Sequence, residues 1–201
     1  MRRRLLGRLR REQRGVTIIE FAMVCPVLLI LLMGLSDLCF QAYLQAVLTG
    51  AVQKAARDSA LEGNGTEAAT TAIDNKVKGA VNGIIKTLVW DKASRQSFGH
   101  FADIGGEYYW DTNKNNSYDP GECFVDTNGS GSWEADPSTA GQGSANAVVV
   151  YQMGFIYPRL FPIAKLIGWS NTVHLTSKTV LKNQPYRFQN TADNVKVCPK
   201  L

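Results

Sequence analysis

The chain has only two histidines, His100 and His174, and neither has an evident catalytic or metal-binding partner in the sequence. The Gly-x-Ser-x-Gly, His-Glu-x-x-His, P-loop and Gly-x-Gly-x-x-Gly patterns of hydrolases, zinc peptidases and nucleotide-binding enzymes are also missing. The four cysteines include no Cys-x-x-Cys pair, which argues against a zinc or thioredoxin-type site. We therefore predict that the protein is not an enzyme, since no residue supports the alternative of a membrane-anchored hydrolase.

Acidic residues are nearly absent from the N-terminal segment. Residues 1–15 contain seven arginines and one acid, Glu12, a net charge of +6, so the remaining residues carry −1 against +5 for the whole chain. A nucleic-acid-binding protein would need a basic surface with interleaved aromatic residues outside this leader, and the sequence has none. We predict no nucleic-acid partner.

Charged residues are also rare in the next segment, which we interpret as a membrane span at residues 16–37. Val16–Ser36 holds a single charge, Glu20, and as a helix it is about 31 Å long, close to the thickness of a bilayer core. The arginines before it favour a cytoplasmic N-terminus, so residues 38–201 are expected in the periplasm. The sequence predicts a single-pass protein of the inner membrane.

The stretch RGVTIIEFAMVCPVLLILLMGLSDL, which begins at Arg14, resembles the class III signal of type IV pilins and pseudopilins. More closely, it resembles the TadE-like family, the minor pilins or pseudopilins of tight-adherence (Flp-type) pilus systems. The resemblance implies that a prepilin peptidase cuts between Gly15 and Val16, and that the carboxylate of Glu20 pairs with the new amine of a neighbouring pilin-like subunit. The implied function is that of a structural subunit in pilus assembly.

Other interpretations of these residues stay open. Glu20 could extend to the cytoplasmic headgroups without a partner, and Pro26 could serve filament packing or be an ordinary proline of a membrane helix. The alternative function is an uncleaved, membrane-anchored periplasmic protein that binds a partner in a calcium-dependent way. Whether the subunit stays in the membrane or enters an extracellular pilus is also open.

The lack of any proline between Pro26 and Pro120 permits long helices. The apolar pattern predicts that the first helix continues past the span to Gly63, and that a second helix begins after Thr66 and ends near Trp90. Segments rich in β-branched and aromatic residues predict strands at 97–110, 145–157 and 172–182. The expected fold class is α+β and pilin-like, with an antiparallel sheet.

A polar segment, residues 111–136, contains a repeat in which Asp111-Thr112-Asn113 recurs fifteen positions later as Asp126-Thr127-Asn128. The first unit fits the calcium-loop pattern Asp-x-[Asp/Asn]-x-[Asp/Asn]-Gly-x5-Glu, with Asn116 in place of the glycine. Asparagine tolerates the left-handed backbone that this position needs. The expected Ca²⁺ ligands are Asp111, Asn113, Asn115, the carbonyl of Ser117, Asp119 and Glu122.

The second unit fits the calcium pattern less well because Pro137 stands at position twelve. We expect it to borrow a ligand, either Asp136 or a group of the first loop. The other expected ligands are Asp126, Asn128, Ser130, Ser132 and Glu134. The alternative to calcium binding is an ordinary polar surface turn, since Asn, Asp, Gly and Ser favour turns for local reasons.

Two of the cysteines, Cys123 and Cys198, fall in the exported part, where the compartment permits a disulfide. We predict that they pair, which would tie the end of the first loop to the C-terminal tail.

Overall fold

The computed structural model describes residues 16–61, 66–161, 165, 168–185 and 195–198. The chain divides into two compact units, which are described separately below. One unit contains Met1–Tyr43 and Pro158–Val173, and the other contains Leu44–Tyr157 and His174–Leu201.

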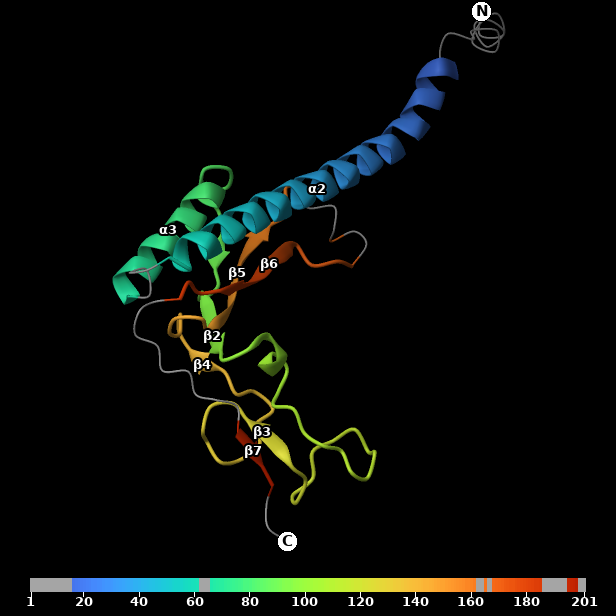
Figure 1. Ribbon diagram of the computed structural model, residues 1–201. Coiled ribbons are helices and arrows are strands. Elements are labelled where there is room, and N and C mark those ends of the chain that lie inside the picture. The colour runs from blue at the N-terminus through green and yellow to red at the C-terminus, as the bar shows by residue number, and fades with distance from the viewer. Residues whose placement is uncertain (1–15, 62–65, 162–164, 166–167, 186–194, 199–201) are drawn as a thin grey trace, which may run out of the picture. The chain divides into compact units, whose positions relative to one another are not determined.

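Helix α2 (Val16–Ser59) is one continuous helix with Pro26 inside it (Figure 1). Its N-terminal part is exposed and almost uniformly apolar, and the helix is long and apolar enough to cross a membrane. After residue 43 the apolar residues become confined to one face, because Leu44, Leu48 and Val52 recur at helical spacing and are fully buried. The predicted long first helix is confirmed.

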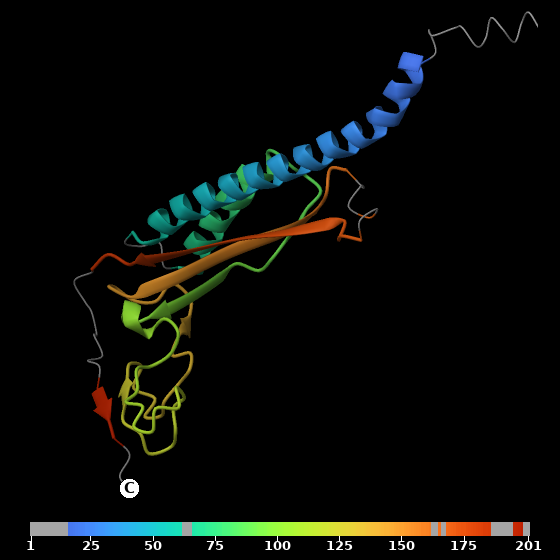
Figure 2. The same ribbon diagram turned by 90° about the vertical axis from the view of Figure 1, so that its right-hand side faces the viewer.

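Helix α3 (Glu67–Asn82) begins as the sequence predicts, with the Thr66 side chain accepting a hydrogen bond from the backbone N–H of Ala69 (3.3 Å). The buried side chains of α3 are those of Ile73, Val77 and Val81. Figures 1 and 2 show α3 beside the C-terminal half of α2, both over one face of the sheet.

The predicted end of this second helix near Trp90 is wrong, because α3 stops at Asn82. Two glycines, Gly79 and Gly83, lower the helix propensity there. The helix ends in a tighter, 3₁₀-like turn, in which the N–H of Ile84 donates to the carbonyl of Val81 (2.9 Å).

The main sheet has five antiparallel strands arranged around β5 (Val148–Pro158). Its other strands are β1 (Val89–Trp90), β2 (Ser94–Phe98), β4 (Thr139–Ala140) and β6 (Thr172–Lys182). Both β1 and β2 pair with β5, β6 pairs with it as well, and β4 extends the sheet beyond β2. Most side chains of β5 are buried, whereas those of β6 alternate between buried and exposed over its first half.

The predicted strand at 97–110 is only partly present. Strand β2 ends at Phe98, and a short 3₁₀ helix, η2 (Phe101–Asp103), follows. The carboxylate of Asp103 accepts a hydrogen bond from the N–H of His100 (2.7 Å), which supports the turn after Gly99. Only Tyr109 returns to β structure, through a single bridge to Phe124.

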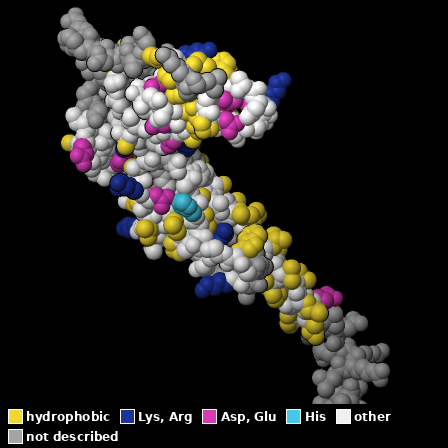
Figure 3. Space-filling view, turned by 90° about the horizontal axis from the view of Figure 1, so that it is seen from below, with side chains coloured by type: hydrophobic (Ala, Val, Ile, Leu, Met, Phe, Trp, Pro, Cys, Tyr) yellow, Lys and Arg dark blue, Asp and Glu magenta, His cyan; other side chains and the backbone are white. Residues whose placement is uncertain are grey.

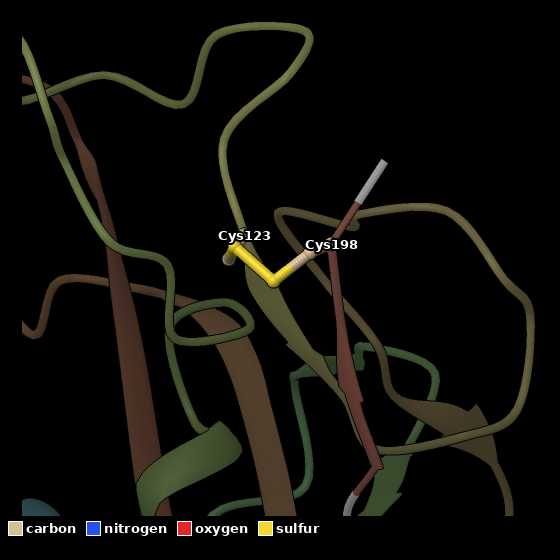
Figure 4. Close-up of a disulfide and its surroundings, with 2 residues drawn as sticks. All are labelled: Cys123 and Cys198. Carbon is tan, nitrogen blue, oxygen red and sulfur yellow. A yellow bond between two sulfur atoms is a disulfide. The ribbon is translucent and has the colours of Figure 1, made fainter. Parts of the chain in front are cut away.

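A second, two-stranded sheet pairs β3 (Phe124–Asp126) with β7 (Val195–Val197). Figure 4 shows the disulfide between Cys123, just before β3, and Cys198, just after β7. The two Cα atoms lie 4.2 Å apart. The bond closes a ring over a sequence separation of 75 residues.

A buried polar cluster joins α3 to the main sheet. The guanidinium of Arg95 donates to the carboxylate of Asp74 (Nη1 to Oδ2, 3.0 Å), and Tyr151 donates its hydroxyl to the same carboxylate (2.6 Å). The guanidinium also lies 4.3 Å from the centre of the Tyr151 ring. Burial and the bond to Asp74 raise the pKa of Tyr151, so this hydroxyl stays a donor.

Candidate functional site

The residues predicted for processing and assembly lie at the N-terminal end of α2. Val16 is the first residue of the helix as described, and Glu20 is exposed one turn into it. Gly15 lies outside the described residues. The carboxylate of Glu20 is therefore open to a partner of opposite charge along the apolar helix.

The first loop, residues 111–122, is folded around the carboxylate of Asp111. This carboxylate accepts hydrogen bonds from the backbone N–H groups of Asn115 (3.2 Å) and Asn116 (2.8 Å). The side-chain oxygen of Asn113 accepts a further bond from the N–H of Asn115 (3.0 Å). Asn116 has φ of +61°, so asparagine takes the left-handed conformation expected of the glycine position.

The side chains predicted as ligands in this loop converge on one carboxylate, that of Asp119. Its Oδ2 accepts hydrogen bonds from the amides of Asn113 (2.6 Å) and Asn115 (2.7 Å). The side-chain oxygen of Asn115 accepts a hydrogen bond from the N–H of Ser117 (2.8 Å), the residue whose backbone carbonyl is predicted as a ligand. Positions one, three, five and nine of the calcium pattern are therefore held together in space.

Glu122, at position twelve, closes the first loop. Its Oε1 accepts from both the N–H (2.7 Å) and the hydroxyl (2.8 Å) of Thr112, and its Oε2 accepts from the N–H of Asp119 (3.1 Å). The backbone bond from Thr112 is the largest cause of a lowered pKa at Glu122. This buried carboxylate is therefore ionised at neutral pH.

The second loop, from residue 126, repeats this geometry. Asp126 accepts hydrogen bonds from the N–H groups of Ser130 (3.2 Å) and Gly131 (2.8 Å), as Asp111 does at the equivalent positions. Gly131 has φ of +76°, matching the left-handed Asn116 of the first loop.

The remaining predicted ligands of the second loop also contact one another. The amide of Asn128 donates to Glu134 Oε2 (2.5 Å), and the oxygen of Asn128 accepts from the N–H of Ser130 (3.0 Å). The hydroxyl of Ser130 donates to the carbonyl of Ser132 (2.9 Å).

Glu107 occupies the closing position of the second loop, and the sequence analysis missed it. Its Oε1 accepts from the N–H (2.9 Å) and the hydroxyl (3.1 Å) of Thr127, and its Oε2 accepts from the N–H of Glu134 (3.0 Å). These three donors occupy the loop positions equivalent to those of the three donors that Glu122 binds in the first loop. Asp136, the expected substitute, instead accepts bonds from the Ser138 N–H (3.1 Å) and the Gln96 amide (3.2 Å).

Glu107 could have been identified from the sequence by extending the repeat toward the N-terminus, because the repeat is longer than the Asp-Thr-Asn triplet. The shared pattern is Gly-Glu-x-aromatic-x-Asp-Thr-Asn, at residues 106–113 and again at 121–128. The two units therefore exchange their glutamates, because each loop is closed by the glutamate that opens the other unit. The rings of Tyr118 and Trp133, at equivalent places, stack with centroids 4.7 Å apart.

The donor set suits a hard cation such as Ca²⁺, which takes carboxylate, amide and backbone carbonyl oxygens. Among the described residues, no three His, Cys, Asp or Glu side chains are grouped so that they could hold a metal ion by themselves. A calcium ion in either loop would therefore depend on the asparagine and backbone oxygens as well as the carboxylates.

The similarity to known proteins lies in the first helix and not in the two loops. No curated protein and no solved structure matches the chain. The family model described as TadE-like protein matches residues 15–57, which include the predicted cleavage position and almost all of α2. The match confirms the resemblance to the TadE-like family noted in the first helix, over residues 15–57.

Proposed function

We propose that this protein is a pilin-like structural subunit, a minor pilin or pseudopilin, of a tight-adherence pilus assembly system. The observation that carries the proposal is the family match over residues 15–57, which begins at the predicted cleavage glycine. The long exposed apolar helix α2 supports it, since a subunit of this kind needs a helix that can pass from lipid into contact with other helices.

Processing by a prepilin peptidase after Gly15 is part of this proposal. The cut would remove the arginine-rich leader and leave an amine at Val16, about one helical turn from Glu20. A carboxylate in hydrocarbon is costly unless it is paired or lies near the interface. The amine of a neighbouring subunit would supply that pairing.

Mass analysis of the protein from its native membrane tests the proposal. The expected mature chain begins at Val16, and Gly15→Val should leave a heavier protein that retains the leader. Arg14→Lys, which keeps the charge and the glycine, serves as the control and should be cut normally. A wild-type protein that still begins at Met1 would overturn the proposed processing.

We propose secondly that the duplicated loop binds two calcium ions, which would brace the exported part. The supporting observation is that Glu107 and Glu122 bind equivalent donors in the two loops, so each loop has a closing carboxylate. Extracellular sites of this type bind at about 10⁻⁴–10⁻³ M. Such a loop also supports the alternative of an uncleaved anchor protein with calcium-dependent binding.

Thermal melting of the full chain in detergent, with chelator and then with millimolar calcium, tests this second proposal. Calcium should raise Tm in a concentration-dependent way. Glu107→Gln should reduce that rise by weakening the second site, while Glu67→Gln, an exposed acid on α3, should leave it unchanged. Equal melting of the wild type with and without calcium would make the loop an ordinary polar turn.

A further inference from the structure

The chain between β5 and β6 is attached to the membrane helix by a buried ion pair. Arg159 Nη1 lies 2.5 Å from Asp37 Oδ2, and the N–H of Leu160 donates to Asp37 Oδ1 (3.2 Å). The side chain of Asp37 is 8% exposed and that of Arg159 15%. Removal of either partner from a pair with so little water around it would leave an uncompensated buried charge, so the two segments are expected to stay joined here.

The returning end of this connection is held at the same place. Arg159 Nε donates to the carbonyl of Ser170 (3.1 Å), and its backbone N–H donates to the carbonyl of Asn171 (2.9 Å). Both ends of the connection therefore meet at Arg159, which pairs with Asp37. They belong to the same compact unit as the N-terminal part of α2.

Asp37 marks the level at which α2 would leave the hydrocarbon of a bilayer. It is the first charged residue after Glu20, and the apolar run ends immediately before it. Leu35 and Leu38, on either side, are each 55% exposed. Figure 3 shows hydrophobic side chains gathered along the N-terminal part of the helix.

Two large apolar side chains of the connection are exposed beside this level. Leu160, whose backbone contacts Asp37, is 49% exposed, and Trp169, next to Ser170, is 60% exposed. Tryptophan is the residue enriched at membrane–water interfaces, because its ring is apolar and its N–H can meet headgroups or water.

We propose that Leu160 and Trp169 form a second membrane contact, at the outer headgroup interface, beside the point where α2 emerges. The occupant is lipid rather than another protein, because the bonds of Arg159 and Leu160 to Asp37 hold these exposed side chains beside the residue at which the apolar run of α2 ends. The inference rests on α2 crossing the membrane and is independent of the pilin role.

Tryptophan quenching in vesicles tests the contact. The full chain is reconstituted into phosphatidylcholine vesicles that contain lipids brominated either near the headgroup or near the chain end. Shallow bromines should quench part of the wild-type fluorescence, and Trp169→Phe should lose most of that quenching. Trp90→Phe is the matched control and should keep it. Equal quenching of the wild type and Trp169→Phe, or stronger quenching by the deep bromines, would overturn the proposal.

A second variant tests the role of the ion pair. Asp37→Asn should reduce the shallow quenching of Trp169, because the connection loses its charged attachment to α2; unchanged quenching would overturn that role. Flotation of the protein with the vesicles reports insertion of α2 separately, so failure of the anchor is distinguished from failure of the contact. If Trp169 becomes shielded only when other pilus subunits are added, the surface is a subunit contact and the proposal is wrong.

Discussion

Tyr151, on strand β5, makes a polar contact between the main sheet and α3. Its hydroxyl donates a hydrogen bond to the Asp74 carboxylate of α3, and the Arg95 guanidinium lies over its ring. Tyr151→Phe keeps the ring but removes the hydroxyl. We expect a loss of about 1 kcal/mol in the free energy of unfolding, typical of one hydrogen bond, measured by urea denaturation.

Asp74→Ala is the sharper version of this test. It leaves the buried guanidinium of Arg95 without its carboxylate, which typically costs about 3–5 kcal/mol. Tyr43→Phe, at an exposed tyrosine, should change stability little and serves as the control. If Tyr151→Phe and Asp74→Ala cost the same, the ion pair with Arg95 contributes nothing beyond the hydroxyl bond.

Glu122 predicts a pH dependence of the first loop. Its folded pKa is lowered from 4.5, first by the bond from the Thr112 N–H, so the ionised form is stabilised in the folded loop. That stabilisation is fully present above about pH 4.5 and is lost as pH falls through the lower, folded pKa.

The NMR shift of the Thr112 N–H, followed during acidification without calcium, should report this titration. The midpoint should lie below 4.5, and Glu122→Gln should abolish it. A midpoint above 4.5 would mean that burial outweighs the hydrogen bonds at this carboxylate.

At the scale of elements, the disulfide is expected to hold β7 on β3. Strand β7 has three residues and pairs only with β3 among the described residues, so its pairing alone is weak. Closing a ring over 75 residues contributes about 4 kcal/mol in the chain-entropy model. Cys198→Ser should therefore lower Tm and expose the β7 amides to hydrogen exchange.

Peptide mapping of the oxidised protein provides the direct check. A cross-linked peptide containing Cys123 and Cys198 is expected, and Cys39→Ser should leave both the cross-link and Tm unchanged. Two free thiols at Cys123 and Cys198 in protein purified from its native membrane would contradict this pairing.

The elements that could be predicted from sequence are those whose signal is local. The apolar run and helical spacing gave α2, Thr66 gave the start of α3, and the β-branched segments gave β5 and β6. Strands β1, β4 and β7 have two or three residues each, too short for a period to be visible.

The residues of the candidate site also differ in how far they could be predicted from the sequence. Ligands within one loop could be proposed from spacing, whereas Glu107 lies outside both twelve-residue windows and reaches the second loop only through folding. The Asp37–Arg159 pair was not predictable from pattern, because the two residues are far apart in the sequence and neither belongs to a motif.

At the scale of the whole molecule, the proposed role of Glu20 is to pair with the N-terminal amine of a neighbouring subunit. Glu20→Gln keeps the shape of the side chain but removes the charge that would meet a neighbour's amine. Membrane insertion should be unchanged or eased, since a neutral side chain is less costly in hydrocarbon. Co-assembly with other pilus subunits should fall, as measured by co-purification and by pilus counts.

Glu67→Gln, at an exposed acid on α3, is the control for this substitution and should assemble normally. Normal pilus production with Glu20→Leu would favour a carboxylate that merely extends to the headgroups.

The exchange of glutamates between the two fifteen-residue units makes each unit self-complementary. Two copies in one chain satisfy each other, so deletion of either copy would leave the survivor without a closing carboxylate. A chain with one copy could close its loop only against the same segment of a second molecule, as in a two-fold dimer. When such a segment is duplicated in tandem, the contact that would otherwise form between two molecules forms within one chain. Closure of the loops then no longer depends on protein concentration.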